Sequence, residues 1–206
     1  MSETTGRHPA STPKGERRRQ LLTEAAAALL AEGGFDAVRH RSVAERAELP
    51  LASTTYYFAS LDELVSAAIE HGSRAELAFG RECLAEVSER QGVLPTEDLV
   101  ELMLDLLLGR SSRDGGLEPV LLRYERLVGS ARRPFLTDLM RGLGEELIGL
   151  LLQLFEHSGT PVDRDRLDEL IALVDGAVVN ALIESNPDPR DAARRMLRRN
   201  LPGRPG

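Results

Sequence analysis

The spacing of the apolar residues constrains the fold most, because it recurs every three or four positions along most of the chain. Such spacing gives a helix one apolar face. Residues that favour strands are sparse: aromatic residues make up 4% of the 206 residues and tryptophan is absent, whereas Ala, Leu, Glu and Arg abound. We therefore expect an all-α protein without strands.

Glycine, proline and capping residues divide the chain into separate helices. Gly33 and Gly34 are expected to end the first helix, and Ser60 with Glu63 three residues later forms a capping-box pattern. A break is also considered at His71. The expected helices cover residues 16–32, 41–47, 50–58, 61–91, 96–109, 117–129, 134–157, 163–185 and 188–200.

Charge is distributed unevenly. The formal net charge is −7, yet residues 1–60 carry eight Lys and Arg against seven Asp and Glu. A near-neutral head with local arginine clusters on an acidic body suits a head that meets an anion. No segment approaches twenty consecutive apolar residues and residues 1–15 lack an apolar core, so we expect neither a membrane span nor a signal peptide, and a cytoplasmic location.

Patterns typical of catalysis or metal binding are missing from the sequence. Cys83 is the only cysteine, which excludes a disulfide framework and a cysteine zinc site. His71 and His157 have no ligand partner at useful spacing. No nucleophile motif, phosphate-binding glycine loop or paired-carboxylate pattern occurs. We expect no enzyme activity, no cofactor and no metal.

Residues 41–58 predict two short helices joined by a three-residue turn, the pattern of a helix-turn-helix. Thr54 and Phe58 lie four residues apart and are expected to face inward. Two adjacent exposed tyrosines suit packing and hydrogen bonding against a sugar-phosphate backbone. The outward face of the second short helix is then Leu51, Ala52, Ser53, Thr55, Tyr56 and Tyr57.

Five short motifs follow one another in a fixed order: Gly34-Phe35, Val43-Ala44-Glu45-Arg46-Ala47, Ser53-Thr54-Thr55-Tyr56-Tyr57-Phe58, Ser60, and Asp62-Glu63-Leu64. Together they resemble the tetracycline-repressor (TetR) family of bacterial regulators over about residues 16–66. The resemblance implies an N-terminal three-helix DNA-binding domain followed by a larger helical domain that binds small molecules and forms the dimer. We expect a flexible arm at residues 1–13, the DNA-binding domain at 14–74, the larger domain at 75–200 and a tail at 201–206.

The sequence departs from the family pattern at four positions. Glu48 stands where the turn usually has glycine, and Pro50 where a capping residue is common. Thr55 replaces the first aromatic residue of the usual tyrosine pair. Leu61 replaces a lysine that commonly contacts phosphate. This last change favours an alternative, a ligand-binding or adaptor protein whose head has lost DNA binding.

The DNA contacts are expected from three places in the head. Arg17 belongs to the run Arg17-Arg18-Arg19, which the family places beside the DNA backbone and which could equally be a solvated helix start. The start of the second helix offers backbone N–H groups and cations to an anion. The expected contact residues are Arg17, Arg39, His40, Arg41, Leu51, Ala52, Ser53, Thr55, Tyr56 and Tyr57.

A mostly apolar pocket is expected in the body, for a hydrophobic or amphipathic small molecule. A ligand against the later turns of the helix beginning at Leu61 could move the head as a unit. The alternative is that the same residues pack with one another as core. The expected lining is His71, Arg74, Leu77, Phe79, Leu99, Met103, Leu107, Leu121 and Tyr124.

Two apolar stripes on the last long helices are expected to form a four-helix bundle between two subunits. The alternative is that both stripes face the core of their own chain. Glycines such as Gly142 and Gly176 lower helix stability unless close packing compensates. The expected subunit contact is Leu143, Leu147, Leu150, Leu151, Leu154, Leu170, Val174 and Val178.

These expectations combine into a DNA-binding repressor that binds a palindromic double-stranded DNA operator as a homodimer and is released by a small molecule. The adaptor without DNA binding is the second hypothesis. A helical-bundle enzyme is the third, and lacks a catalytic constellation.

Overall fold

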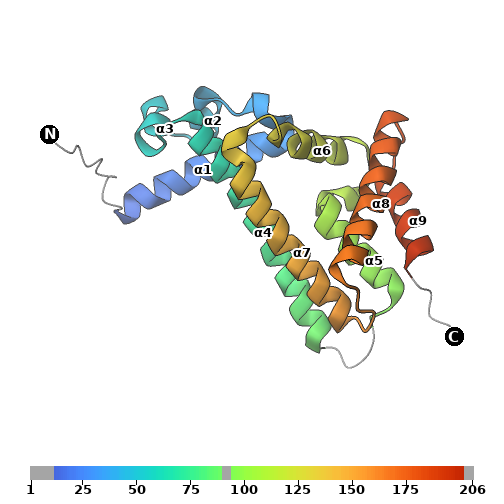
Figure 1. Ribbon diagram of the computed structural model, residues 1–206. Helices are drawn as coiled ribbons and strands as arrows, with labels where there is room; N and C mark the ends of the chain where they lie inside the picture. Colours follow the sequence, from blue (N-terminus) through green and yellow to red (C-terminus); the bar gives the residue numbers. More distant parts are fainter. Residues whose placement is uncertain (1–11, 90–93, 202–206) are drawn as a thin grey trace. The chain divides into compact units, whose positions relative to one another are not determined.

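A computed structural model describes residues 12–89 and 94–201. Every regular element in these ranges is a helix, which confirms the expected all-α class (Figure 1). The chain divides into two compact units between His71 and Gly72, and we describe each unit separately.

The first unit holds three helices and the beginning of a fourth. They are α1 (Pro13–Ala37), α2 (His40–Arg46), α3 (Leu51–Tyr57) and α4 (Leu61–Glu89). The second and third helices lie within one or two residues of their expected ends. Helix α4 continues through His71, so the break considered there does not occur.

Helix α1 begins three residues before its expected start because Thr12 caps it. The Thr12 side chain accepts a hydrogen bond from Gly15 N at 3.1 Å, and Pro13 occupies the first turn. At its other end the regular geometry is interrupted at Gly33 and Gly34. Gly34 has φ +65°, a left-handed conformation that favours glycine. The sequence therefore placed this interruption correctly.

The second unit contains the remaining helices. They are α5 (Thr96–Leu108), η1 (Arg110–Asp114), α6 (Glu118–Ser130), η2 (Pro134–Leu136), α7 (Thr137–His157), α8 (Arg164–Ile183) and α9 (Pro189–Asn200). The expected helix at 134–157 is thus a short 3-10 turn followed by α7. The expected end of the fourth helix, at residue 91, lies outside the described residues.

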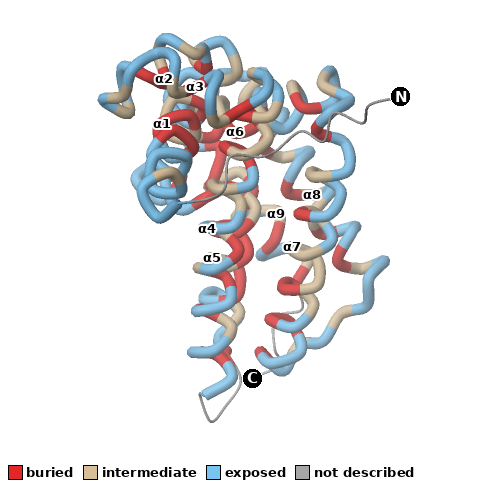
Figure 2. The backbone as a smooth tube through the Cα atoms, turned by 90° about the vertical axis from the view of Figure 1, so that its left-hand side faces the viewer, coloured by how far each residue is buried: buried red, intermediate tan, exposed pale blue. Residues whose placement is uncertain are grey.

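The core of the second unit comes mainly from α5, α7 and α8. Met103, Leu151, Phe155, Leu170 and Val174 are fully buried there. Figure 2 shows buried stretches alternating with exposed ones along the helices, as amphipathic spacing requires.

Gly80 of α4 allows α4, α5 and α7 to approach closely. A Cβ atom at this position would lie 2.8 Å from Leu106 Cδ2 and would also overlap the Leu150 side chain. The part of α4 that belongs to the second unit accordingly runs beside α7 (Figure 1). Any larger residue at position 80 would push these helices apart.

Three further observations concern membrane spans, metal binding and the cysteine. Within residues 12–89 and 94–201 no helix combines the length and apolar character needed to cross a membrane. The same residues contain no group of three or more His, Cys, Asp or Glu arranged to hold a metal ion. Burial raises the pKa of the Cys83 thiol, which favours its inert, protonated form.

Candidate nucleic-acid interface and ligand pocket

Helices α2 and α3 form a helix-turn-helix because their inward residues share one small core. Val43, Thr54 and Phe58 are almost completely buried. The Thr54 hydroxyl donates to Leu51 O at 2.8 Å, so burial leaves its polar atom satisfied. The two inward residues predicted for α3 are therefore confirmed, and the opposite face of α3 is left for another molecule.

The turn between α2 and α3 is held in an unusual backbone conformation. Glu48 has φ +54°, in the left-handed region, at the position where the resembled family usually has glycine. Leu49 N donates to Ala44 O at 3.0 Å and Glu48 N donates to Glu45 O at 3.2 Å. The turn thus keeps its geometry against the steric cost of the Glu48 side chain.

The outward face of α3 is exposed except at Ser53 and Tyr57, which are half-buried. Leu51 and Tyr56 are 54% and 63% exposed, and Ala52 and Thr55 are also exposed. Tyr57 is half-buried. Its hydroxyl lies 3.9 Å from the point where a Cβ atom on Gly15 would be, so its ring borders the first turn of α1. Sequence reasoning treated both tyrosines as fully exposed.

The cations of the first unit fall into two groups. Arg39 Nε donates to Asp36 O at 3.1 Å, and Arg41 Nε donates to Glu45 Oε1 at 2.8 Å. Arg17 has no ion pair or side-chain hydrogen bond with any described residue. Of the three expected arginines, Arg41 is thus in an ion pair with Glu45, Arg39 gives one donor to a backbone carbonyl and keeps its charge, and Arg17 has all its donors available within the described residues.

Two further cations, Lys14 and Arg18, also have no partner among the described residues. Arg18 belongs to the arginine run expected beside the DNA backbone, whereas Lys14 is not among the predicted contacts. With Arg17 they occupy positions i, i+3 and i+4, which lie on one face of a helix. That spacing was visible in the sequence, but the start of α1 had been placed at residue 16. The three cations and Tyr57 surround the first turn of α1.

His40 lies at the first position of α2 and is half-buried. Its Nδ1 atom is buried and has no hydrogen-bond partner among the described residues. The imidazole therefore has only Nε2 left to offer to an outside acceptor.

The start of α4 is satisfied from within the chain. Glu63 N donates to Ser60 Oγ at 3.1 Å, as the predicted capping box requires, and Ala59 N donates to Glu63 Oε2 at 2.7 Å. Arg19 pairs with Glu63 at 3.5 Å and lies over the Phe58 ring at 4.8 Å. Leu61 occupies the position where the resembled family commonly has a lysine. The charged group at the start of α4 is therefore the Glu63 carboxylate and not an unpaired cation.

Two of the nine residues expected to line an effector pocket lie in the lining of the pocket between α6 and α8, and the other seven lie outside that lining. Leu77, Leu99 and Met103 are buried in the core, and His71 and Leu107 are half-buried. Two others contact charged side chains. Arg74 donates to Glu146, at 2.5 Å from Oε1, and Phe79 lies under the Arg110 guanidinium at 4.6 Å.

Leu121 and Tyr124 do line a pocket, one of about 510 Å³ between α6 and α8. The Tyr124 hydroxyl donates to Asp175 Oδ1 at 2.7 Å and so links the two helices. Burial and this carboxylate raise the pKa of Tyr124, so its hydroxyl remains a donor. The full lining is Leu121, Tyr124, Glu125, Val128, Gly129, Arg132, Arg133, Val179 and Leu182.

The expected subunit contact needs correction. Seven of its eight residues are buried within their own chain, and only Leu147 is half-buried. A side chain without exposed surface in one chain has none to bury against a second chain. The two stripes therefore form core, the alternative considered for them. The buried residues are Leu143, Leu150, Leu151, Leu154, Leu170, Val174 and Val178.

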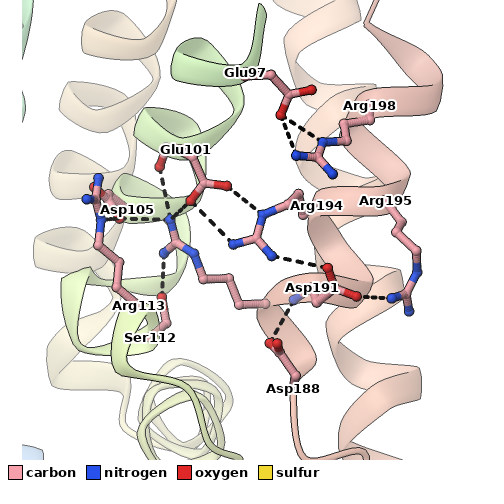
Figure 3. A network of polar contacts seen from close by, with 11 residues as sticks. Glu97, Glu101, Asp105, Ser112, Arg113, Asp188, Asp191, Arg194, Arg195 and Arg198 are labelled. Atoms are coloured by element: carbon pink, nitrogen blue, oxygen red, sulfur yellow. Dashed lines mark hydrogen bonds and ion pairs between the residues drawn. The ribbon is translucent and has the colours of Figure 1, made fainter.

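Sequence reasoning missed a charge ladder between α5 and α9, which Figure 3 shows from close by. Three carboxylates at four-residue spacing on α5 face three arginines at four-residue spacing on α9. Arg198 Nε donates to Glu97 Oε2 at 2.8 Å, Arg194 Nε to Glu101 Oε1 at 2.5 Å, and Arg190 Nη2 to Asp105 Oδ1 at 2.9 Å. The charge ladder is thus Glu97, Glu101, Asp105, Arg190, Arg194 and Arg198.

The Arg190–Asp105 pair of the charge ladder is buried and also bonds to residues of η1. The side chains of Arg190 and Asp105 are 3% and 0% exposed. Arg190 also donates to Ser112 Oγ at 2.7 Å, and Arg113 Nε donates to Asp105 Oδ1 at 2.7 Å. Arg190 Nε is buried without a partner among the described residues. These bonds fix η1, which precedes α6, against α5 and α9.

Two family models match the sequence. One, described as bacterial regulatory proteins of the tetR family, covers residues 22–68, and one described as a tetracyclin repressor-like C-terminal domain covers residues 94–203. No protein with a curated description matches.

Several solved structures match nearly the whole chain. The multidrug binding protein EbrR in complex with imidazole is 27% identical, with a TM-score of 0.64, over 97% of this chain and 98% of its own. A TetR-family member from Streptomyces coelicolor A3 is 28% identical, with a TM-score of 0.60, over 90% and 99%. A TetR transcription regulator from Haloarcula marismortui ATCC 43049 shares the fold at 18% identity, with a TM-score of 0.65, over 90% and 97%. Other EbrR structures contain proflavin, ethidium or malachite green.

Proposed function

The chain belongs to the TetR family of regulators, and from this premise we propose that it is a repressor that binds a palindromic operator as a homodimer and is released by a small molecule. The observation that carries the proposal is the helix-turn-helix of the first unit. One face of α3 packs into the core of the first unit, and the opposite face exposes Leu51, Ala52, Thr55 and Tyr56 to solvent. One such helix per subunit fits the major groove at each half-site.

The cations of α1 support phosphate binding beside this helix. Lys14, Arg17 and Arg18 are exposed and have no partner among the described residues. Phosphate contacts fix the register of a protein on DNA, while groove contacts read the bases. We assign Lys14, Arg17 and Arg18 to the backbone and the outward face of α3 to the bases.

Selection of bound sequences from a random DNA pool tests the proposal directly. We expect a palindrome whose half-sites are about one helical turn apart. Lys14 is the only lysine of the chain, so its acetylation by an amine-reactive reagent reports on α1. The selected operator should protect Lys14, and a scrambled duplex should protect it less. A pool without enriched sequences would favour the adaptor whose head has lost DNA binding.

The homodimer is proposed on a new face, because the original stripes are core. Four residues of α8 form an exposed row of small or apolar side chains: Ala172, Gly176, Val179 and Ile183. Ile183 is 76% exposed, and no atom lies within 4 Å of a Cβ position on Gly176. Another helix could approach this row closely, as a two-fold contact between identical helices requires.

Light scattering of two matched variants tests this face. Val179→Asp places a carboxylate in the proposed contact, and we expect a monomer that binds the operator weakly. Ser88→Asp adds the same charge at an exposed position of α4 and should remain a dimer. A dimeric Val179→Asp protein would remove α8 from the proposed contact.

Release by a small molecule is proposed because the chain matches EbrR, which binds several drugs, over most of its length. Linkage requires that a ligand and the operator weaken each other by the same factor. A factor of about 100 needs about 3 kcal/mol of differential binding. Titration of a candidate compound into free protein and into the operator complex measures this factor, and equal affinities would exclude that compound.

A further inference from the structure

The outward face of α3 lacks the side chains that usually identify a base by two hydrogen bonds. We propose that α3 instead recognises the 5-methyl groups of thymine, through the apolar side chains of Leu51 and Ala52 and the methyl group of Thr55. This inference deepens the proposed function and rests on it, because it names the chemical feature of the operator that α3 reads.

The composition of α3 limits how it can read a base. Its seven residues, Leu51–Tyr57, include no charged side chain and no side-chain amide. Two hydrogen bonds to guanine come from Arg or Lys, and two to adenine come from Asn or Gln. Such bidentate recognition is therefore not available to α3. It can offer the major groove single hydrogen bonds from hydroxyl groups and apolar contacts with thymine methyl groups.

The exposed side chains of α3 form one apolar patch, made of Leu51, Ala52 and Thr55. Leu51 is 54% exposed, and Ala52 and Thr55 are also exposed. Thr55 follows Leu51 by four residues and Ala52 by three, so the three side chains are neighbours on the helix surface. A thymine methyl group that covers part of this patch removes apolar area from water.

The hydroxyl groups of α3 are less suited to identify a base. Thr54 is buried and donates to Leu51 O at 2.8 Å, and Thr55 donates to Ala52 O at 3.3 Å. The proton of each hydroxyl is thus used inside the helix. Ser53 has no hydrogen-bond partner among the described residues, but it is half-buried. A single serine hydroxyl can donate to one base and accept from another, so it distinguishes bases poorly.

Tyr56 is the remaining polar side chain on the outward face of α3. It is 63% exposed, and its ring meets the Tyr57 ring edge-on with 4.9 Å between the centroids. Tyr57 borders the first turn of α1, where Lys14 has no partner among the described residues. We therefore expect the Tyr56 hydroxyl to bond a phosphate oxygen, a contact that carries no sequence information.

The charges beside the apolar patch favour DNA as the molecule that covers it. Lys14, Arg17 and Arg18 are exposed on α1 and have no partner among the described residues. The major groove exposes thymine methyl groups between two rows of phosphates, so it matches an apolar patch beside available cations. A second copy of the chain docked on this patch by a two-fold axis would bring two groups of like charge together, which is unfavourable.

Base reading from α2 is the alternative. Arg41 is paired with Glu45 at 2.8 Å, and Arg39 Nε donates to Asp36 O at 3.1 Å. The first helix of a helix-turn-helix crosses the DNA backbone, so both guanidinium groups are expected at phosphates. The bases in the groove are then left to α3.

Replacement of thymine by uracil in the selected operator tests the proposal, because uracil lacks only the 5-methyl group and pairs as thymine does. Each thymine is replaced in turn, and binding of the full chain is measured by fluorescence anisotropy. We expect at least one thymine in each half-site whose replacement weakens binding about four-fold, and about fifteen-fold when both half-sites are changed.

Two matched double variants identify the groups that detect the methyl. Leu51→Ala with Thr55→Ser removes apolar atoms and keeps every hydroxyl, and should bring the affinity ratio of the thymine and uracil operators close to one. Ser53→Ala with Tyr56→Phe removes two hydroxyls and keeps the apolar patch, and should preserve this ratio. None of the four side chains is buried, so both variants should fold, which circular dichroism verifies.

Three results would overturn the proposal. They are equal binding of the thymine and uracil operators at every position, a ratio that survives in the Leu51→Ala, Thr55→Ser variant, and a ratio that the Ser53→Ala, Tyr56→Phe variant loses. Each of them leaves the selected operator bound and the proposed function standing. A random pool that yields no enriched sequence would contradict the proposed function itself, and this inference with it.

Discussion

The arginines at the start of the first unit and the buried arginines of the second unit are used in opposite ways. In residues 12–71 the arginines lie on the surface, and Arg17 and Arg18 have no partner among the described residues. In the second unit, Arg190 is buried between Asp105 and Glu101, and Arg123 donates to Leu107 O at 2.8 Å and to Glu76 Oε1 at 2.7 Å. Arg17 and Arg18 are thus unpaired surface charges, whereas Arg190 and Arg123 connect helices inside the second unit.

This difference teaches that the number of arginines says little about where an anion binds. A guanidinium has five donors, and only those not used within the chain can recognise another molecule. The charge ladder consumes the donors of α9, whereas the first turn of α1 leaves its charges available. Whether a given guanidinium is already paired, rather than how many arginines a unit holds, therefore decides which of them can meet an anion.

The largest expected change in stability comes from removing a buried arginine of the second unit. Arg190→Ala leaves the Asp105 carboxylate, 0% exposed, without one of its two arginines, and we expect a loss of about 3–5 kcal/mol in the free energy of unfolding. Urea unfolding followed by circular dichroism measures it. Arg195→Ala removes an exposed arginine of the same helix and should cost less than about 1 kcal/mol. Similar losses for both variants would show that burial does not distinguish the charge ladder.

The role of the unpaired surface arginines in DNA binding is tested by combining Arg17→Ala with Arg18→Ala. Each lost phosphate contact should lower the slope of log affinity against log salt by about one. We expect the slope for the selected operator to fall by about two, with the free energy of unfolding unchanged within about 0.5 kcal/mol. Arg195→Ala serves again as the control, and should leave the slope unchanged. An unchanged slope in the double variant would place the DNA elsewhere.

A third test uses acid to open the charge ladder. Hydrogen bonds from Arg194 and Arg190 hold the pKa of Glu101 at about 2, below its ordinary value of 4.5. A lowered carboxylate pKa contributes stability that is complete above pH 4.5 and is lost as the pH falls toward 2. Glu101→Gln should therefore flatten the dependence of unfolding free energy on pH in this window. Because Glu101 is partly exposed, solvent screening makes this effect smaller than that of Arg190→Ala.

The smallest expected effect concerns the turn of the first unit. Glu48→Gly removes the side chain from a residue with φ +54°, and we expect a gain of about 0.5–1 kcal/mol, because the flexibility of glycine in the unfolded chain offsets part of the relief. Glu48→Ala keeps a Cβ atom and should show no such gain. Thermal unfolding of the two variants compares them. A larger gain for alanine than for glycine would show that Glu48 stores no strain.

Much of the head could be predicted because its signals are local. Gly33 and Gly34 end the regular part of α1, Ser60 and Glu63 cap α4, and Thr54 faces inward, all from residues within a few positions of one another. Capping, left-handed glycines and the face of a short helix depend on neighbours in sequence. The start of α1 was misplaced because Thr12 had been assigned to the arm.

The body was predicted less well because its signals are not local. The stripe that contains Leu151 and the stripe that contains Val174 have the same spacing whether they meet their own chain or a second one, and the structure buries both in one chain. The sequence by itself determined that the protein is helical, where most helices end and which face of each is apolar. Only the tertiary structure decided which faces meet, that the carboxylates of α5 pair with the arginines of α9, and that a pocket opens between α6 and α8. The physical reason is that periodicity fixes the direction of a side chain about its own helix axis, whereas its partner depends on packing among helices far apart in the chain.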